Sequence, residues 1–188
     1  MMKKVLKRYL AFLITLAFIL FVIIMLKTFT PSEIVSRIGV NNSYIILFLI
    51  SAIGGSSLAT ASSYYVIIPI FAIAGLNPWL LGLFGGLGVS LGDLFYFYLG
   101  SKGNEASSGE LNYKLKKVHS VLERIPRGGI PFFVYLWALT PLPNDVMTFS
   151  LGITGYPFKR VIIPIILGNI TITVILSYLA IYGVRLFW

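Results

Sequence analysis

The chain contains no cysteine, and charged residues make up only 11% of it. The absence of cysteine excludes disulfide bonds, Cys-ligated zinc and thiol chemistry. One histidine and six acidic residues are also too few for an ordinary metal centre. The sequence shows neither a nucleophile paired with a base nor a phosphate-binding loop. We therefore predict that the protein is not an enzyme and holds no cofactor.

Apolar residues dominate the composition, with a hydrophobic fraction of 57% and a mean hydropathy of +0.91. A soluble domain has about 25% charged residues and could not bury this much apolar surface, whereas a bilayer accepts it. Backbone inside a bilayer must satisfy its own hydrogen bonds, which favours helices. We therefore predict an all-α integral membrane protein with one membrane domain over residues 1–188. The net charge of +9 is interpreted as membrane topology and contact with anionic lipid head groups, not as nucleic-acid binding.

Three segments are long enough to be transmembrane helices. Tyr9–Leu26 and Val161–Val184 contain no charged residue, and Trp79–Ser101 contains a single one, Asp93. The first segment exceeds the roughly 7–15 apolar residues of a signal peptide, and no small-residue cleavage site follows it, so we expect a permanent helix. Between this span and residue 43, Pro31 and Ser32 suit the start of a short interfacial helix.

Two further regions consist of a short apolar piece, a polar break and another short apolar piece. Tyr44–Ile53 and Tyr64–Gly75 flank a break rich in glycine, serine and threonine at 54–63. Ile130–Leu139 and Val146–Gly155 flank the break 140–145, which reads Thr-Pro-Leu-Pro-Asn-Asp. A transmembrane helix needs about 20 apolar residues. Each of these pieces is much shorter, so we predict two re-entrant helical hairpins.

The hairpins belong to a predicted repeat, 44–101 and 130–188, in which each hairpin precedes a long span. The spacing between Gly75 and Gly88 equals that between Gly155 and Gly168. The polar segment 102–129 separates the units. Within it, apolar residues at helical spacing predict an amphipathic surface helix; they are Leu111, Leu115, Val118 and Leu122.

Lysine and arginine predict the orientation, because cytoplasmic loops carry an excess of both. With the N-terminus inside, twelve basic residues lie inside and three outside. The expected location is a cell membrane, with the N-terminus cytoplasmic and the C-terminus outside. Two full crossings per hairpin would give the same distribution, so charge does not exclude them. In the hairpin topology the units are inverted, as in secondary transporters, whose sites lie near the midplane.

Asp93 and Asp145 are the only acids in the predicted membrane region. Such acids are costly and mark pathways or proton relays. The alternative for Asp93 is a position near the inner end with a tyrosine partner, and for Asp145 the N-cap of the following helix. The Gly/Ser/Thr break is either a polar vestibule or a close-packing segment, and the glycines at 82, 85, 86, 88 and 92 are predicted to pack helices. The candidate pathway residues are Asp93, Asp145, Asn144, Pro141, Pro143, Thr140, Ser56, Ser57, Tyr96 and Tyr98.

The segment from Gly92-Asp93 through Gly100, Lys102 and Gly103 resembles a motif of the DedA superfamily, also called the SNARE-associated Golgi protein or VTT-domain family. Phe97 stands at its usual tyrosine position. A second family segment is matched by Pro141, Gly152 and Phe158, while its two arginine positions hold Ala138 and Asn144. The acidic residue usual in the first hairpin is also missing. The resemblance covers about residues 44–184 and indicates a divergent, short branch.

The resemblance implies an inverted repeat of re-entrant hairpins and translocation of lipids or lipid phosphates, with proton coupling as a further expectation. Without the arginines, bidentate phosphate binding loses its usual donors. The alternatives are an ion-coupled exporter of small solutes and a non-transporting assembly factor. Expected partners are anionic lipids, a coupling proton or cation, and, as an open alternative, a second copy of the chain.

Overall fold

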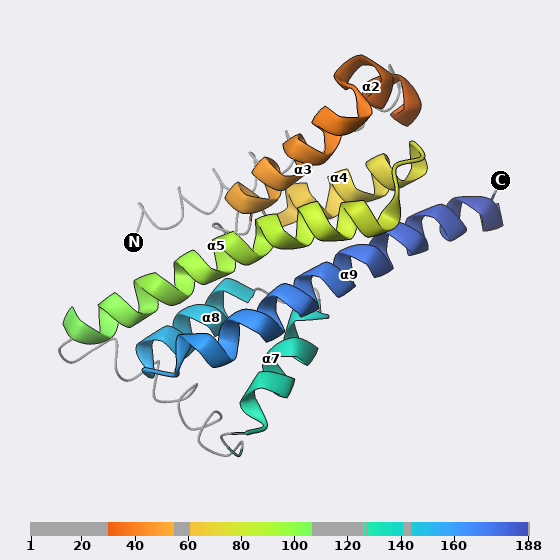
Figure 1. Ribbon diagram of the computed structural model, residues 1–188. Coiled ribbons are helices and arrows are strands. Elements are labelled where there is room, and N and C mark those ends of the chain that lie inside the picture. Colours follow the sequence, from red (N-terminus) through yellow and green to blue (C-terminus); the bar gives the residue numbers. More distant parts are fainter. Residues whose placement is uncertain (1–29, 55–60, 107–125, 127, 141–143, 188) are drawn as a thin grey trace, which may run out of the picture.

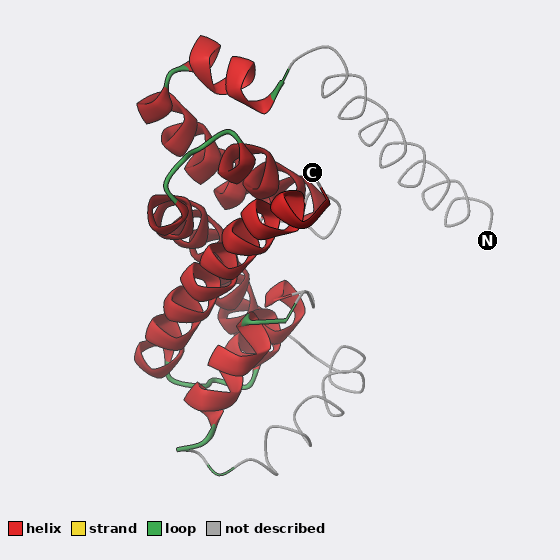
Figure 2. Ribbon diagram, turned by 90° about the vertical axis from the view of Figure 1, so that its right-hand side faces the viewer, coloured by secondary structure: helices red, strands yellow, loops and turns green. Residues whose placement is uncertain are grey.

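The computed structural model describes residues 30–54, 61–106, 126, 128–140 and 144–187. Within these ranges the regular structure consists of seven helices and no strand (Figures 1 and 2). The predicted all-α class is therefore confirmed. The predicted span Tyr9–Leu26, the residues 111–122 that predict the surface helix, and parts of both hairpin breaks lie outside the described residues.

The first described helices are α2 (Pro31–Ile38) and α3 (Val40–Gly54). Thr30 caps α2: its hydroxyl accepts from the Glu33 amide at 3.3 Å, and the Glu33 carboxylate accepts from the Thr30 amide at 2.7 Å. This reciprocal pair, together with Pro31 in the first turn, starts the helix where the sequence predicted. The axes of α2 and α3 differ by 99°, so α2 lies across the direction of α3.

The remaining helices form two sets with the same order, short, short and long. The first set continues from α3 with α4 (Ala61–Ile73) and α5 (Pro78–Ala106). The second comprises α7 (Ile130–Ala138), α8 (Asn144–Ile153) and α9 (Phe158–Phe187). Two of the described helices are long and apolar enough to cross a membrane, over 78–103 and 158–184, and the bent pair α2–α3 would make a third.

The turn before each long helix has the same backbone geometry. Gly75 and Gly155 have φ of +93° and +68°, in the left-handed region that glycine adopts without a Cβ clash. Leu76 donates to the carbonyl of Phe71, and Tyr156 donates to that of Leu151, both at 3.1 Å. Each is the outer hydrogen bond of a Schellman C-cap. The same local chemistry therefore ends α4 and α8 and leads into α5 and α9.

The long helices α5 and α9 pack against each other and run in opposite directions (Figure 1). The N-terminal half of α5 packs on α3 of its own set, and its C-terminal half packs on α8 of the other set. Likewise, α9 packs on α7 of its own set and on α4 of the other set. Thus the second short helix of each set packs against the long helix of the other set.

Glycines allow the close approach of these helices. A Cβ added at Gly88 would lie 2.5 Å from the Phe48 carbonyl oxygen on α3. A Cβ added at Gly86 would lie 2.6 Å from the backbone of Ile170 on α9. Gly82 and Gly85 also face α9 side chains. The predicted packing role is therefore confirmed for these four glycines, as expected where membrane helices associate through small residues.

Candidate functional site

Asp93 lies on α5 where this helix meets α9, and only 1% of its surface is exposed. Its carboxylate oxygen Oδ2 accepts a hydrogen bond of 2.8 Å from the side-chain amide of Asn169 on α9. Asn169 is also 1% exposed. Its amide nitrogen donates a second bond, of 3.1 Å, to the hydroxyl of Ser90, which lies about one turn before Asp93. One buried amide therefore joins the two long helices at their polar contact.

Asn144 brings α8 to the same point. It is the first residue of that helix, and its amide nitrogen lies 3.4 Å from Oδ2 of Asp93 and 3.0 Å from Oδ1 of Asn169. The side-chain oxygen Oδ1 of Asn144 is buried and has no hydrogen-bond partner. Ser90, Asp93, Asn144 and Asn169 are called the Asp93 cluster below. The cluster joins the second short helix of one set to both long helices.

Among the described residues, the Asp93 carboxylate accepts side-chain hydrogen bonds from two asparagines, Asn144 and Asn169. Among the residues that the structure describes, Asp93 has no ion pair with lysine, arginine or histidine. The described residues also include no group of three or more His, Cys, Asp or Glu side chains that could hold a metal. A buried carboxylate without a cationic partner is costly when ionised.

A second polar contact between the sets involves Tyr64 on α4 and Thr173 on α9. Both side chains are buried, and their hydroxyl groups form a hydrogen bond. The Thr173 hydroxyl donates to the carbonyl oxygen of Asn169, one turn earlier on α9, at 2.6 Å. The polar contact thus continues from the Asp93 cluster along α9 to α4.

These two contacts occupy matching positions in the repeat. The offset that relates Gly75 to Gly155, and Gly88 to Gly168, defines which residues correspond. By the same offset Tyr64 corresponds to Asn144, and Asp93 corresponds to Thr173. The Tyr64–Thr173 and Asn144–Asp93 contacts are therefore equivalents, each linking the second short helix of one set to the long helix of the other.

Asp145 is 8% exposed and forms different contacts from its neighbour Asn144. Its oxygen Oδ1 accepts from the amide of Val146 at 2.9 Å. Since α8 begins at Asn144, Asp145 lies inside the first turn and is not the N-cap that the sequence left as an alternative. A negative charge in this turn still interacts favourably with the helix dipole. The structure shows no hydrogen bond between Asp145 and the Asp93 cluster.

Of the other predicted site residues, the structure describes Tyr96, Tyr98 and Thr140. Tyr98 is 55% exposed, and Tyr96 is partly buried on α5. The hydroxyl of Thr140 donates to the carbonyl of Trp137 at 2.6 Å, which closes the end of α7. The remaining four residues lie outside the described part of the chain; they are Ser56, Ser57, Pro141 and Pro143.

Sequence reasoning missed Asn169, Ser90, Tyr64 and Thr173. A signal for part of this set was present, because Asn169, Thr173 and Ser177 recur at every fourth position in a largely apolar helix. Residues at this spacing share one face of a helix. All three are buried, so they form the polar face that α9 turns toward the rest of the protein.

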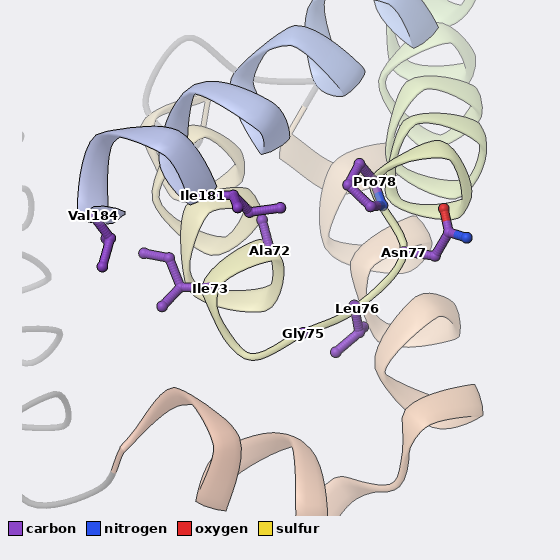
Figure 3. A pocket seen from close by; sticks show the side chains of 8 residues that line it. All are labelled: Ala72, Ile73, Gly75, Leu76, Asn77, Pro78, Ile181 and Val184. Atoms are coloured by element: carbon purple, nitrogen blue, oxygen red, sulfur yellow. The ribbon is translucent and has the colours of Figure 1, made fainter. Parts of the chain in front are cut away.

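An open cavity of about 520 Å³ lies elsewhere, between the turn from α4 to α5 and the C-terminal part of α9 (Figure 3). Its lining residues are Ala72, Ile73, Gly75, Leu76, Asn77, Pro78, Ile181 and Val184. None of them belongs to the predicted site or carries a charge. The cavity therefore lies apart from the Asp93 cluster and does not extend it.

Comparison with known families assigns the chain. The family model of the VTT domain matches residues 62–182. The chain belongs to the VTT-domain family. The VTT domain is shared by DedA and SNARE-associated Golgi proteins. In this chain it includes nearly all of α4, the whole of α5, α7 and α8, and most of α9. The whole Asp93 cluster therefore lies within it. No curated protein and no solved structure matches the chain. The VTT domain and the apolar long helices together identify a membrane protein.

Proposed function

We propose that this VTT-domain protein moves lipids or lipid phosphates across the bilayer, with a proton or cation as the coupling ion. The observation that carries the proposal is the Asp93 cluster. A carboxylate that is 1% exposed lies at the contact of two long apolar helices, and its hydrogen-bond partners among the described residues are neutral. Ionisable groups in such places serve transport pathways or proton relays in membrane proteins.

The proposed topology is a single membrane domain built as an inverted repeat. In it, α5 and α9 cross the bilayer, and the pairs α3–α4 and α7–α8 enter and return on their own sides. Three features support it. The long helices are antiparallel (Figure 1), the turns at Gly75 and Gly155 match, and the second short helix of each set packs on the long helix of the other set. The span Tyr9–Leu26 is proposed as the third crossing. In such architectures, substrate and coupling-ion sites lie where broken helices meet.

The contacts of the cluster support a specific role within this mechanism. Asn144 stands where the family resemblance places an arginine, and Ala138 stands at the other arginine position. An amide and a methyl group cannot make the bidentate contact with which arginine holds a phosphate. The proposed role of Asp93 is therefore to hold the coupling ion, while lipid moves along the surfaces of the hairpins.

A flipping assay in proteoliposomes tests the proposal. The purified protein is reconstituted with fluorescent lipids of several head groups, including an anionic and a zwitterionic one, and an impermeant quencher reports transfer between leaflets. We expect transfer at least tenfold above protein-free vesicles for one or more lipids. Asp93→Asn, which keeps the shape of the side chain, should remove this activity, whereas Asn41→Ala on the exposed part of α3 should keep it.

The alternatives predict different results in the same vesicles. An ion-coupled exporter of small solutes would leave lipid transfer at background and carry a solute instead. A non-transporting assembly factor would show neither activity. Background transfer for every lipid tested, by protein shown to be folded, would reject the lipid proposal.

A further inference from the structure

The Asp93 cluster has more oxygen atoms than a site that only binds a proton requires. Asp93 contributes a carboxylate, Asn144 and Asn169 each contribute a carbonyl oxygen, and Ser90 contributes a hydroxyl. In the structure, the amide nitrogens of both asparagines face Oδ2 of Asp93, at 3.4 Å and 2.8 Å. The carboxylate is thus satisfied by two amide groups, each of which carries an oxygen on the same rotating end.

The side-chain oxygen of Asn144, Oδ1, provides the second, independent observation. It is buried and has no donor, although the nitrogen of the same amide lies 3.0 Å from Oδ1 of Asn169 and 3.4 Å from Asp93. Buried polar atoms normally have a partner. A positive group beside this oxygen would satisfy it, and among the described residues no lysine, arginine or histidine bonds to any member of the cluster.

We propose that the Asp93 cluster is a binding site for a small monovalent cation, with sodium as the ion to test. The inference rests on the proposed transport function and names its coupling ion. Rotation of the two amide ends would exchange nitrogen for oxygen toward Asp93. The two asparagines, which now donate hydrogen bonds to the carboxylate, would then present oxygen atoms to a cation, together with Asp93 and Ser90. This change needs no movement of the helices.

The charge of the site favours a monovalent ion. Asp93 is the only acid in the cluster, and the Oδ1 atom of Asp145 accepts from the Val146 amide at 2.9 Å. Magnesium and calcium are usually held with more carboxylates or several waters, and the described residues contain no group of three or more acidic or imidazole side chains. Neutral oxygens with one carboxylate match a single positive charge.

Equilibrium binding of ²²Na⁺ to the purified full chain in detergent tests this site without a transport assay. The protein is kept in choline chloride at alkaline pH, where carboxyl groups are ionised, and titrated with sodium; excess potassium and excess magnesium serve as competitors. We expect saturable binding of one sodium per chain, together with a rise in melting temperature on sodium addition, because a ligand of the native state stabilises it.

Three variants locate the ion. Asp93→Asn should weaken sodium binding at least tenfold, and Ser90→Ala, which removes a single oxygen, should weaken it severalfold while the chain remains folded. Asn41→Ala, on the exposed face of α3, should bind as the parent does. Gel filtration and the melting temperature in choline establish folding for each variant. If Asp93→Asn fails to fold, sodium binding by Ser90→Ala decides whether the ion lies in the Asp93 cluster.

The outcomes separate this proposal from the proposed function. Absence of sodium binding by the folded parent, or equal binding by the parent and the folded variants at Ser90 and Asp93, would overturn the cation site. Magnesium competing better than sodium would overturn the monovalent assignment. Sodium binding without lipid transfer would keep the site and reject lipid as the substrate. Lipid transfer without sodium binding would keep the transport proposal and leave the proton as its ion.

Discussion

Tyr64 and Asn144 occupy equivalent positions in the two halves of the repeat, and each bonds to the long helix of the opposite set. Tyr64 contacts Thr173 on α9, and Asn144 contacts Asp93 on α5. The two contacts differ in chemistry, because the first joins two neutral hydroxyl groups and the second joins an amide to a carboxylate. The repeat therefore has a polar link on both sides but carries the charge on only one.

The Tyr64–Thr173 link should contribute measurably to stability. Both hydroxyl groups are buried, and a typical hydrogen bond contributes about 0.5–1.5 kcal/mol net. In a double-mutant cycle of Tyr64→Phe and Thr173→Val, we expect a coupling energy of about 1 kcal/mol. Unfolding in mixed micelles measures it. The control cycle of Tyr98→Phe and Thr173→Val should be additive, because Tyr98 is exposed and does not bond to Thr173; equal coupling in both cycles would contradict the link.

The contact between Gly100 on α5 and Gly152 on α8 should tolerate no side chain. A Cβ at Gly100 would lie 2.2 Å from the Phe149 carbonyl oxygen, and one at Gly152 would lie 2.1 Å from that of Phe97. Because the obstructing atoms are backbone, we expect each alanine substitution to cost about 1–3 kcal/mol through overpacking.

Gly183 is the control for these substitutions, because no atom lies within 4 Å of an added Cβ there. Gly183→Ala should leave stability unchanged or raise it by up to about 1 kcal/mol, since alanine is the better helix former. Thermal unfolding in one detergent compares the three variants. Equal melting temperatures for Gly100→Ala and Gly183→Ala would show that α5 and α8 are not in close contact.

The element order could be predicted because it depends on local patterns. Apolar runs, the turn glycines Gly75 and Gly155, and the start at Pro31 placed the described helices close to their observed positions. Some predicted pieces were shorter than the helices formed. For example, α3 begins at Val40 and not at Tyr44, because Asn41 and Asn42 continue the helix at an exposed end.

The composition of the site was less predictable because it depends on pairing between helices. Asp93 could be singled out, since an acid in an apolar helix is unusual. Its main partner, Asn169, lies on another helix in the second half of the chain, and nothing in one sequence reports which faces of two helices meet. Tyr64 is similar: nothing in the sequence distinguishes it from the other tyrosines, and only the packing of α4 on α9 gives it a partner.

Cysteine labelling tests the proposed topology in this cysteine-free chain. A cysteine at position 112 should react with an impermeant reagent only from the cytoplasmic side, and one at position 41 only from the outside, as the distribution of twelve and three basic residues predicts. Position 57, in the first hairpin break, distinguishes the hairpin from two crossings. A re-entrant hairpin exposes it, if at all, to outside reagent, whereas two full crossings expose it to the inside. Rapid labelling from the inside would therefore reject the hairpin.

Asp145 should serve transport in addition to its local role in α8. Its carboxylate accepts from the Val146 amide in the first helical turn, where a negative charge contributes typically about 0.3–1 kcal/mol. Asp145→Asn keeps the shape and an accepting oxygen, so stability should fall by no more than about 1 kcal/mol, while transport is lost or no longer follows the ion gradient. Asp145→Ala removes both contributions and therefore does not separate them. Transport by folded Asp145→Asn in proteoliposomes across a pH series is the measurement, with Asn41→Ala as the control. Activity equal to the parent at every pH would make Asp145 a purely structural residue and leave Asp93 as the only acid in the proposed mechanism.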